Sequence, residues 1–308
     1  MRRFEPSEPI PNGAKGASIA LGNFDGVHLG HRAVISAAHE AAEAKGLALG
    51  AAVFSPHPGR VLKPDAPPFQ LQTPDQRSRA LKALGVQVQY VIGFDRTLAQ
   101  LSDRAFVEQE LVRHIGAKHV CVGADFHFGR GRSGNVESLT ALGEEFGFGV
   151  TAVAPVGDGE KYSSSAIRAA IAAGDLAKAN MELGRPWAIE GEVRKGFQRG
   201  REFGFRTANI ALGDYVRPRL GIYAVRVRIG DALHEGVASV GVNPTVGALP
   251  EPVLEAHIFN FDADIYGQTI EVEMIAFLRD EAKFETADIL VRQIAEDAAA
   301  ARDLLKGV

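Results

Sequence analysis

Two histidines three residues apart give this chain its clearest candidate for chemistry. His28 and His31 lie in a glycine-rich stretch, residues 21–32, which follows a short apolar run and leads into an alanine-rich amphipathic segment that stops at Gly46. That order predicts a strand, a turn and a helix. Such a turn leaves backbone N–H groups at the start of a helix, where phosphate binds well, and residues three apart share one helical face. The stretch therefore predicts a phosphate-binding turn that carries two imidazoles.

Three further polar patches, residues 54–58, 123–131 and 162–168, each follow a run of residues that predicts a strand. Strands and helices alternate through this half of the chain, which predicts a parallel sheet covered by helices on both faces. Ligands of such sheets bind at the carboxyl ends of the strands. The patches would bring imidazoles, hydroxyls, free N–H groups and Arg168 to one crevice, where they could orient and neutralise a phosphate under attack.

Each of these patches also has a plainer interpretation. His57 lies between two prolines and could belong to a structural turn, while the serines at 163–165 could simply cap a helix. Residues 125–129 fit an ordinary loop anchored by aromatic side chains as well as they fit a nucleotide contact. The agreement of all four patches at one sheet edge favours a nucleotide site.

The sequence pattern changes near residue 184. Short alternating segments follow at 187–193, 222–227, 233–240, 253–259 and 269–277. They predict an antiparallel sheet or a small barrel. Thr286 then begins a predicted helix, in which Ile289, Leu290, Ile294 and Leu304 form an apolar stripe suited to packing on the barrel. We therefore expect two domains, residues 1–183 and 184–308.

The second domain contains three weaker candidates for chemistry. Residues 191–201 form a glycine- and arginine-rich turn, and the hydroxyl of Thr207 and the amide of Asn209 could bind Mg²⁺ and phosphate oxygens. Glu255 shares one face of a predicted strand with His257, and a carboxylate inside a barrel mouth is a candidate general base. A solvated hairpin and an exposed strand glutamate are the alternatives that the residues alone leave open.

The composition excludes several classes of protein. The chain has 308 residues, 46% of them hydrophobic, and a net charge of −4, so nucleic acid is a poor default partner. The lone Cys121 excludes an intrachain disulfide and a cysteine-built metal site. Prolines follow the basic N-terminus in place of an apolar segment, and no apolar run reaches membrane-spanning length. We expect a cytoplasmic protein without a membrane partner.

Residues 22–31, Gly-Asn-Phe-Asp-Gly-Val-His-Leu-Gly-His, resemble the adenylyltransferase signature of the prokaryotic bifunctional riboflavin kinase/FAD synthetase family. The first signature alone identifies only a wider nucleotidyltransferase superfamily, and the second domain narrows the resemblance to this family. The resemblance covers nearly the whole chain, through residues 54–58, 123–131, 163–168, 184–210, 241–245, 254–267 and 278–284. It implies an N-terminal Rossmann-like nucleotidyltransferase domain with a parallel sheet and a C-terminal riboflavin kinase β-barrel that ends in a helix.

The resemblance also implies two reactions and their residues. The second domain would phosphorylate riboflavin to FMN, and the first would transfer AMP from ATP to FMN, giving FAD and pyrophosphate, both with Mg²⁺. His28 and His31 would hold the ATP phosphates and stabilise the transition state, Thr207 and Asn209 would ligate Mg²⁺-ATP, and Glu255 would take the proton of the riboflavin 5′-hydroxyl. The residues expected to contact nucleotides are Gly22, Asn23, Phe24, Phe54, His57, Asp125, Ser164, Ser165, Arg168, Gly196 and Arg201.

The chain departs from the family pattern at several positions. Tyr162 replaces the usual Ile, Ser165 the usual Thr, Ser55 the usual Glu and Asp125 a frequent Asn. Arg206 stands where the family has a proline, which would rigidify the turn that presents the threonine and the asparagine. Arg206 is the only support for one alternative, an adenylyltransferase with an impaired kinase half. A second alternative, from another class, is a flavin-binding regulator without turnover. The oligomeric state is not predicted.

Overall fold

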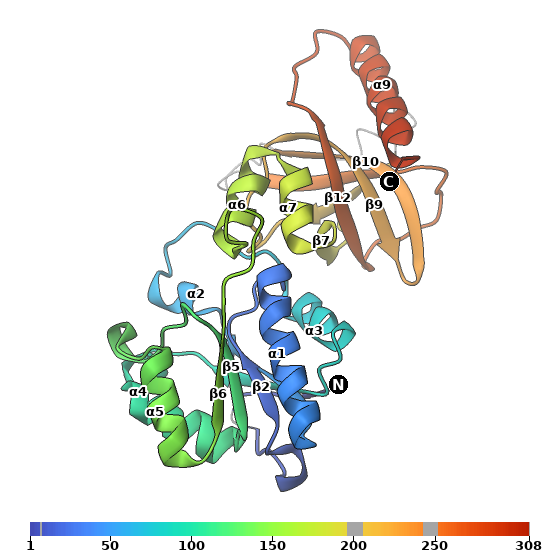
Figure 1. Ribbon diagram of the computed structural model, residues 1–308. Helices are drawn as coiled ribbons and strands as arrows, with labels where there is room; N and C mark the ends of the chain where they lie inside the picture. The colour runs from blue at the N-terminus through green and yellow to red at the C-terminus, as the bar shows by residue number, and fades with distance from the viewer. Residues whose placement is uncertain (7, 196–205, 243–251, 308) are drawn as a thin grey trace. The chain divides into compact units, whose positions relative to one another are not determined.

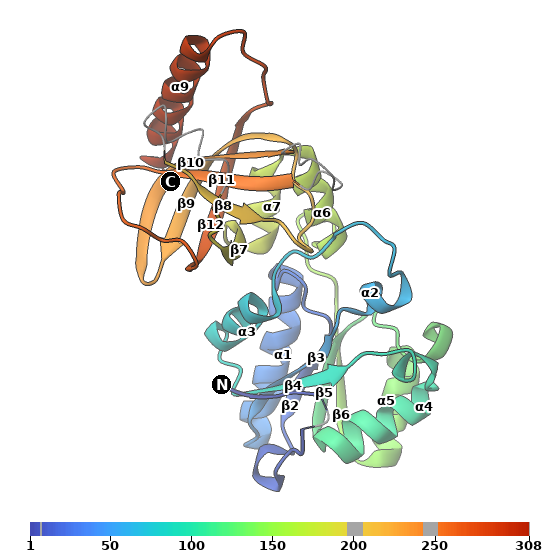
Figure 2. The same cartoon turned by 180° about the vertical axis from the view of Figure 1, so that it is seen from behind.

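The computed structural model describes residues 1–6, 8–195, 206–242 and 252–307. The chain packs as two units, one formed by Met1–Pro67 with Pro74–Ser163 and the other by Pro68–Thr73 with Ser164–Val308 (Figures 1 and 2). The helices α6 (Ser164–Ala173) and α7 (Leu176–Leu183) pack with the second unit, so this unit begins before the expected boundary at residue 183. The division of the two activities at that residue stays a prediction.

The first unit is built on a parallel sheet of six strands in the order β1-β4-β3-β2-β5-β6. The strands are β1 (Arg2–Phe4), β2 (Ser18–Leu21), β3 (Leu49–Ser55), β4 (Val88–Gly93), β5 (His119–Gly123) and β6 (Gly149–Val153). The chain runs from β2 to β3 and β4 on one side and continues with β5 on the other side of β2. The order therefore reverses between β2 and β5, and such switch points hold ligands in open α/β sheets.

Helices cover both faces of this sheet, as predicted (Figure 1). They are α1 (Leu29–Lys45), α2 (Pro58–Leu62), α3 (Pro74–Ala83), α4 (Asp103–Phe106) and α5 (Val136–Phe146), with a π-helical stretch Val107–Ile115 and short 3₁₀ helices at Asn12–Ala14, Leu98–Gln100 and Arg130–Arg132. One face packs apolar residues of α1 and α3, and the other packs those of α4, the π-helical stretch and α5. Ser102 caps α4, because its Oγ accepts from Ala105 N at 3.1 Å.

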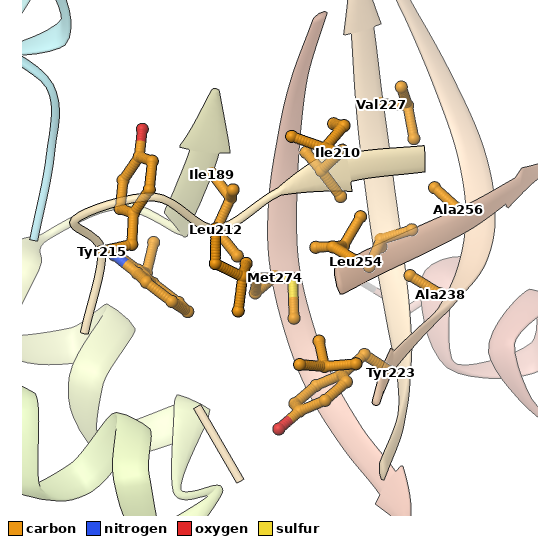
Figure 3. Close-up of a cluster of buried hydrophobic side chains, with 14 of the residues drawn as sticks. Ile189, Ile210, Leu212, Tyr215, Tyr223, Val227, Ala238, Leu254, Ala256 and Met274 are labelled. Carbon is orange, nitrogen blue, oxygen red and sulfur yellow. The ribbon is translucent and has the colours of Figure 1, made fainter. Parts of the chain in front are cut away.

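The second unit is a nearly closed antiparallel barrel of six strands in the order β7-β12-β9-β10-β11-β8. The strands are β7 (Trp187–Glu192), β8 (Ala208–Ala211), β9 (Gly221–Ile229), β10 (Ala232–Val242), β11 (Pro252–Ile258) and β12 (Thr269–Arg279). Arg194 N donates to Asn209 O at 2.9 Å and so bridges the two edges of the sheet. Alternate residues fill the interior, among them Ile210, Leu254 and Met274 (Figure 3).

The barrel is followed by the helix α9 (Ala287–Leu305), capped by Thr286 as predicted. The predicted packing stripe is wrong at its start, because Ile289 is 44% exposed. The buried face lies toward the end of the helix, where Ala298, Ala301 and Leu305 pack against residues of β9, β10 and β12. Small residues let the helix approach the barrel closely there, and the amphipathic pattern alone does not locate that contact.

Candidate active sites

The turn between β2 and α1 holds both predicted histidines against each other. His28 is the N-cap of α1, and its Nδ1 accepts from His31 N at 3.4 Å. The two imidazole rings stack, with centroids 3.7 Å apart and planes 25° from parallel. A Cβ at Gly30 would lie 3.1 Å from Cε1 of His28 and 3.4 Å from Tyr162 O, so glycine is what leaves room for the stack. The structure confirms that the two histidines share one face.

Phe24 anchors the turn. Its side chain is buried and meets the His31 ring edge to face, with centroids 5.2 Å apart. Phe24 and Val27 have positive φ angles of 50° and 43°, and residues other than glycine adopt such angles only at a cost in conformational energy. Gly22 lies against the Phe24 ring, where a Cβ would be 3.3 Å from the nearest ring carbon. The backbone of the turn is thus held in an uncommon conformation by buried packing, a pattern that clusters at functional sites.

The end of β3 carries the second predicted patch. The Ser55–Pro56 bond is cis, and His57 caps the short helix α2, with Nδ1 accepting from Gly59 N at 3.0 Å. Phe54 packs among aromatic rings, and its centroid lies 5.8 Å from that of Phe94. One nitrogen of His57 therefore has a structural role, and its expected contact with a nucleotide stays a prediction.

Arg77 contacts both the turn after β2 and the end of β3, and none of the sequence motifs includes it. It projects from α3, is only 7% exposed, and its Nη1 donates to Asn23 O at 3.0 Å and to Phe54 O at 3.3 Å. Burial lowers the pKa of Arg77 to about 10, and attraction by the carboxylate of Asp25 opposes that shift. Arg77 stands three and four residues before Ala80 and Leu81, so a cation on the apolar face of this helix is the sequence signal for it.

The loop after β5 carries Asp125, where the family often has asparagine. The Lys161 ammonium bonds to the Asp125 carboxylate and holds its pKa below the usual value. The same loop stacks Phe126 on Phe128, with centroids 5.6 Å apart, and buries Phe128. Lys161 therefore offsets the extra negative charge that Asp125 brings to this patch.

Ser164, Ser165 and Arg168 begin α6, which packs in the second unit. Arg168 Nε donates to Phe69 O at 2.6 Å, and its guanidinium lies over the Phe69 ring, 5.3 Å from the centroid. Phe69 also belongs to the second unit. That these three residues bind the triphosphate held by His28 and His31 stays a prediction.

The barrel contains a cavity of about 300 Å³ beside the start of β8. Thr207 and Asn209 line it, and Asn209 Nδ2 donates to Thr207 O at 3.3 Å and to Thr207 Oγ1 at 3.4 Å. Asp262 and Asp264 also line the cavity. The remaining lining residues are Val193, Arg206, Ala208, Ala256, Ile258, Phe261, Ala263, Ile265 and Tyr266. Hydroxyl, amide and carboxylate oxygens are the ligands that Mg²⁺ prefers, so this donor set fits a magnesium–nucleotide complex.

Glu255 lies on β11 directly opposite Asn209 of β8 and Ser239 of β10. The predicted alternation is confirmed, since Leu254 and Ala256 are buried inside the barrel while Glu255 is half-buried. Glu255 therefore faces away from the apolar interior of the barrel, and its role as a general base stays a prediction. Residues directly opposite each other in an antiparallel pair have Cβ atoms about 5 Å apart. The register thus puts the candidate base beside the candidate metal ligand Asn209.

Arg206, which replaces the family proline, lies on the wall of the same cavity. Its guanidinium forms an ion pair with Asp262, and Nη1 also donates to Asp262 O at 3.3 Å. Its backbone carbonyl is 2.9 Å from Nδ1 of His257. Arg206 is therefore held by Asp262, which also lines the cavity. Gly196 and Arg201, the remaining predicted nucleotide contacts, lie outside the described residues.

Comparison with known proteins decides the family. Residues 10–167 match the family model of FAD synthetase, and residues 183–305 match that of riboflavin kinase. This chain belongs to the bifunctional riboflavin kinase/FMN adenylyltransferase family. The relative of that name from Escherichia coli K12 is 38% identical over 94% of this chain and 93% of its own length. The Bacillus subtilis relative is 38% identical over 91% of this chain and 89% of its own.

The likeness extends to the whole fold of a solved structure. A crystal structure named as a macrolide-efflux protein from Streptococcus pneumoniae superposes with a TM-score of 0.86 and 33% identity, over 97% of this chain and 98% of that chain. In the part of the chain that the structure describes, no helix is both long and apolar enough to cross a membrane. This chain and that structure therefore share one fold, in which a parallel α/β sheet is followed by an antiparallel barrel and a final helix.

Proposed function

We propose that the turn around His28 and His31 transfers the adenylyl group of ATP to FMN, and that the cavity beside Thr207 and Asn209 is where riboflavin is phosphorylated. The chain is a bifunctional enzyme of FAD synthesis with a domain for each step. The assignment rests on one observation: each matched domain has its own cluster of phosphate-binding groups. These are the stacked imidazoles of His28 and His31 in the first domain, and the hydroxyl and amide of Thr207 and Asn209 in the second. The substrates are ATP, riboflavin and FMN.

In adenylyl transfer, a phosphate oxygen of FMN attacks the α-phosphorus of ATP and pyrophosphate leaves. That phosphate is already largely ionised near neutral pH, so the reaction needs orientation and charge stabilisation more than a base. The stacked rings of His28 and His31 and the N-terminus of α1 supply positive or donor groups at one place. Ser164, Ser165 and Arg168 are proposed to complete the triphosphate site.

In the kinase reaction, the riboflavin 5′-hydroxyl attacks the γ-phosphorus of ATP and ADP leaves. Glu255 is proposed to take the hydroxyl proton, and Thr207 and Asn209 would hold Mg²⁺, which would neutralise charge on the phosphates. Nothing favours a chain with an impaired kinase half. Arg206 was the only support for that alternative, and it is held by Asp262 on the cavity wall beside both proposed metal ligands. A cytoplasmic location stays a prediction from the sequence.

The double variant His28→Ala with His31→Ala tests the assignment. FAD formation from supplied FMN should collapse, while FMN formation from riboflavin should persist, both measured by chromatographic separation of the flavins. His39→Ala is the matched control, because His39 is an exposed histidine on the same helix. Unimpaired FAD formation in the double variant would contradict the assignment, and loss of both activities in a folded protein would contradict separate sites.

A further inference from the structure

Arg77 joins two segments of the first unit that both carry proposed site residues. Its Nη1 donates to Asn23 O, in the turn before His28 and His31, and to Phe54 O, near the end of β3 before His57. Both bonds come from a single nitrogen, at 3.0 Å and 3.3 Å. One cation from α3 therefore links the turn after β2 to the end of β3 and fixes the spacing between them.

Stability alone does not account for a cation in this position. The side chain is only 7% exposed, and removing a charge from water costs several kcal/mol unless its hydrogen bonds are replaced. Its positive charge is partly compensated by Asp25, itself buried in the same turn, while Arg3 repels it. Well-packed apolar side chains often stabilise a fold as much as buried charges do. The advantage of arginine here is the geometry that its bonds impose.

We propose that Arg77 is a positioning residue for adenylyl transfer. It holds the carbonyl of Asn23 against the end of β3 and so fixes the turn from which the stacked histidines project. Transfer between two phosphates depends on alignment of the reacting atoms, and a displacement of about 1 Å can lower the rate about 100-fold. The proposal rests on the assignment of His28 and His31 made above, and Arg77 itself is not proposed to touch the nucleotide.

Arg77→Met removes both bonds and keeps a long side chain. The kcat of FAD formation from FMN should fall about 10- to 100-fold, with a smaller change in KM for ATP. Riboflavin phosphorylation by the same molecules should be unchanged, because that site lies in the other unit, and thermal unfolding measures whether the first unit is folded. Arg77→Lys should recover most of the kcat, because one ammonium nitrogen can bond both carbonyls. Lys82→Met is the matched control, since Lys82 is an exposed cation on the same helix.

Wild-type kcat in Arg77→Met would overturn the proposal. If that variant does not fold, Arg77→Gln replaces it, and the proposal then requires the glutamine variant to be slow and the lysine variant to be fast. Equal kcat in those two variants would overturn it as well. The two assignments can be refuted separately. If the variant without His28 and His31 still forms FAD, the assignment of the site is wrong. If that variant is inactive but Arg77→Met forms FAD at the wild-type rate, only the positioning role of Arg77 is wrong.

Discussion

Replacing Glu255 with glutamine should stop riboflavin phosphorylation while FAD formation from FMN continues. The change is nearly isosteric and removes one charge from a half-buried strand residue that faces away from the barrel interior. Substitutions outside the core usually change the free energy of unfolding by about 0.5 kcal/mol or less. Loss of a general base lowers a rate about 10²- to 10⁴-fold, or about 3 to 5 kcal/mol in the activation barrier. The expected change in the activation barrier is therefore several times the expected change in the free energy of unfolding.

The assay follows both steps in one protein. The variant is incubated with riboflavin, ATP and Mg²⁺, and in a second reaction with FMN, ATP and Mg²⁺, and the flavins are separated by chromatography. Glu235→Gln is the matched control, because Glu235 is an exposed glutamate on the neighbouring strand β10 of the same barrel. Thermal unfolding of both variants reports on the fold. FMN formation should fall only in Glu255→Gln.

Two results would refute the reasoning behind this prediction. Near-normal FMN formation by Glu255→Gln would show that the proton of the riboflavin hydroxyl goes elsewhere. A parallel loss of FMN formation and of thermal stability would show that Glu255 supports the barrel. In that case its register opposite Asn209 would carry no chemical meaning.

Asp297→Ala should lower the free energy of unfolding by about 3 kcal/mol, measured with urea, because it breaks the two-bond ion pair by which Arg279 of β12 anchors α9. His119 should make stability pH-dependent: burial and the Lys45 ammonium lower its pKa below 6.5, so the unfolded chain binds more protons. Unfolding free energy should therefore fall as the pH drops below 6.5, and less so in His119→Gln. Arg206→Pro should change KM for ATP in the kinase reaction by less than about fivefold, because an exposed ion pair contributes about 0–1 kcal/mol.

The features that depend on local pattern could be predicted from the sequence. The strand, glycine turn and helix around His28 and His31 follow from periodicity and turn chemistry, and the structure confirms that both rings share one face. The same holds for the Ser102 cap and for the alternation of β11, which separates Glu255 from Leu254. Each of these depends on residues no more than a few positions apart.

Features that depend on distant partners could not be predicted. β1 is three residues long beside prolines and forms only because β4 pairs with it. Residues 68–73 leave the first unit and pack with the second, where Leu71 O accepts from the indole of Trp187 at 2.8 Å. The position of Arg77 likewise follows from two carbonyls, of Asn23 and Phe54, that are far from it in sequence. Long-range packing decides each of these, and no local pattern records it.

We propose that this one chain carries two consecutive activities at separate sites. The most direct measurement is a time course in which the purified protein receives riboflavin, ATP and Mg²⁺, with FMN and FAD quantified by chromatography. We expect FMN to form first and then to be converted to FAD, and we expect the double variant His28→Ala with His31→Ala to stop at FMN. Failure to consume riboflavin while supplied FMN is converted to FAD would contradict the proposal, as would FAD formation by the double variant.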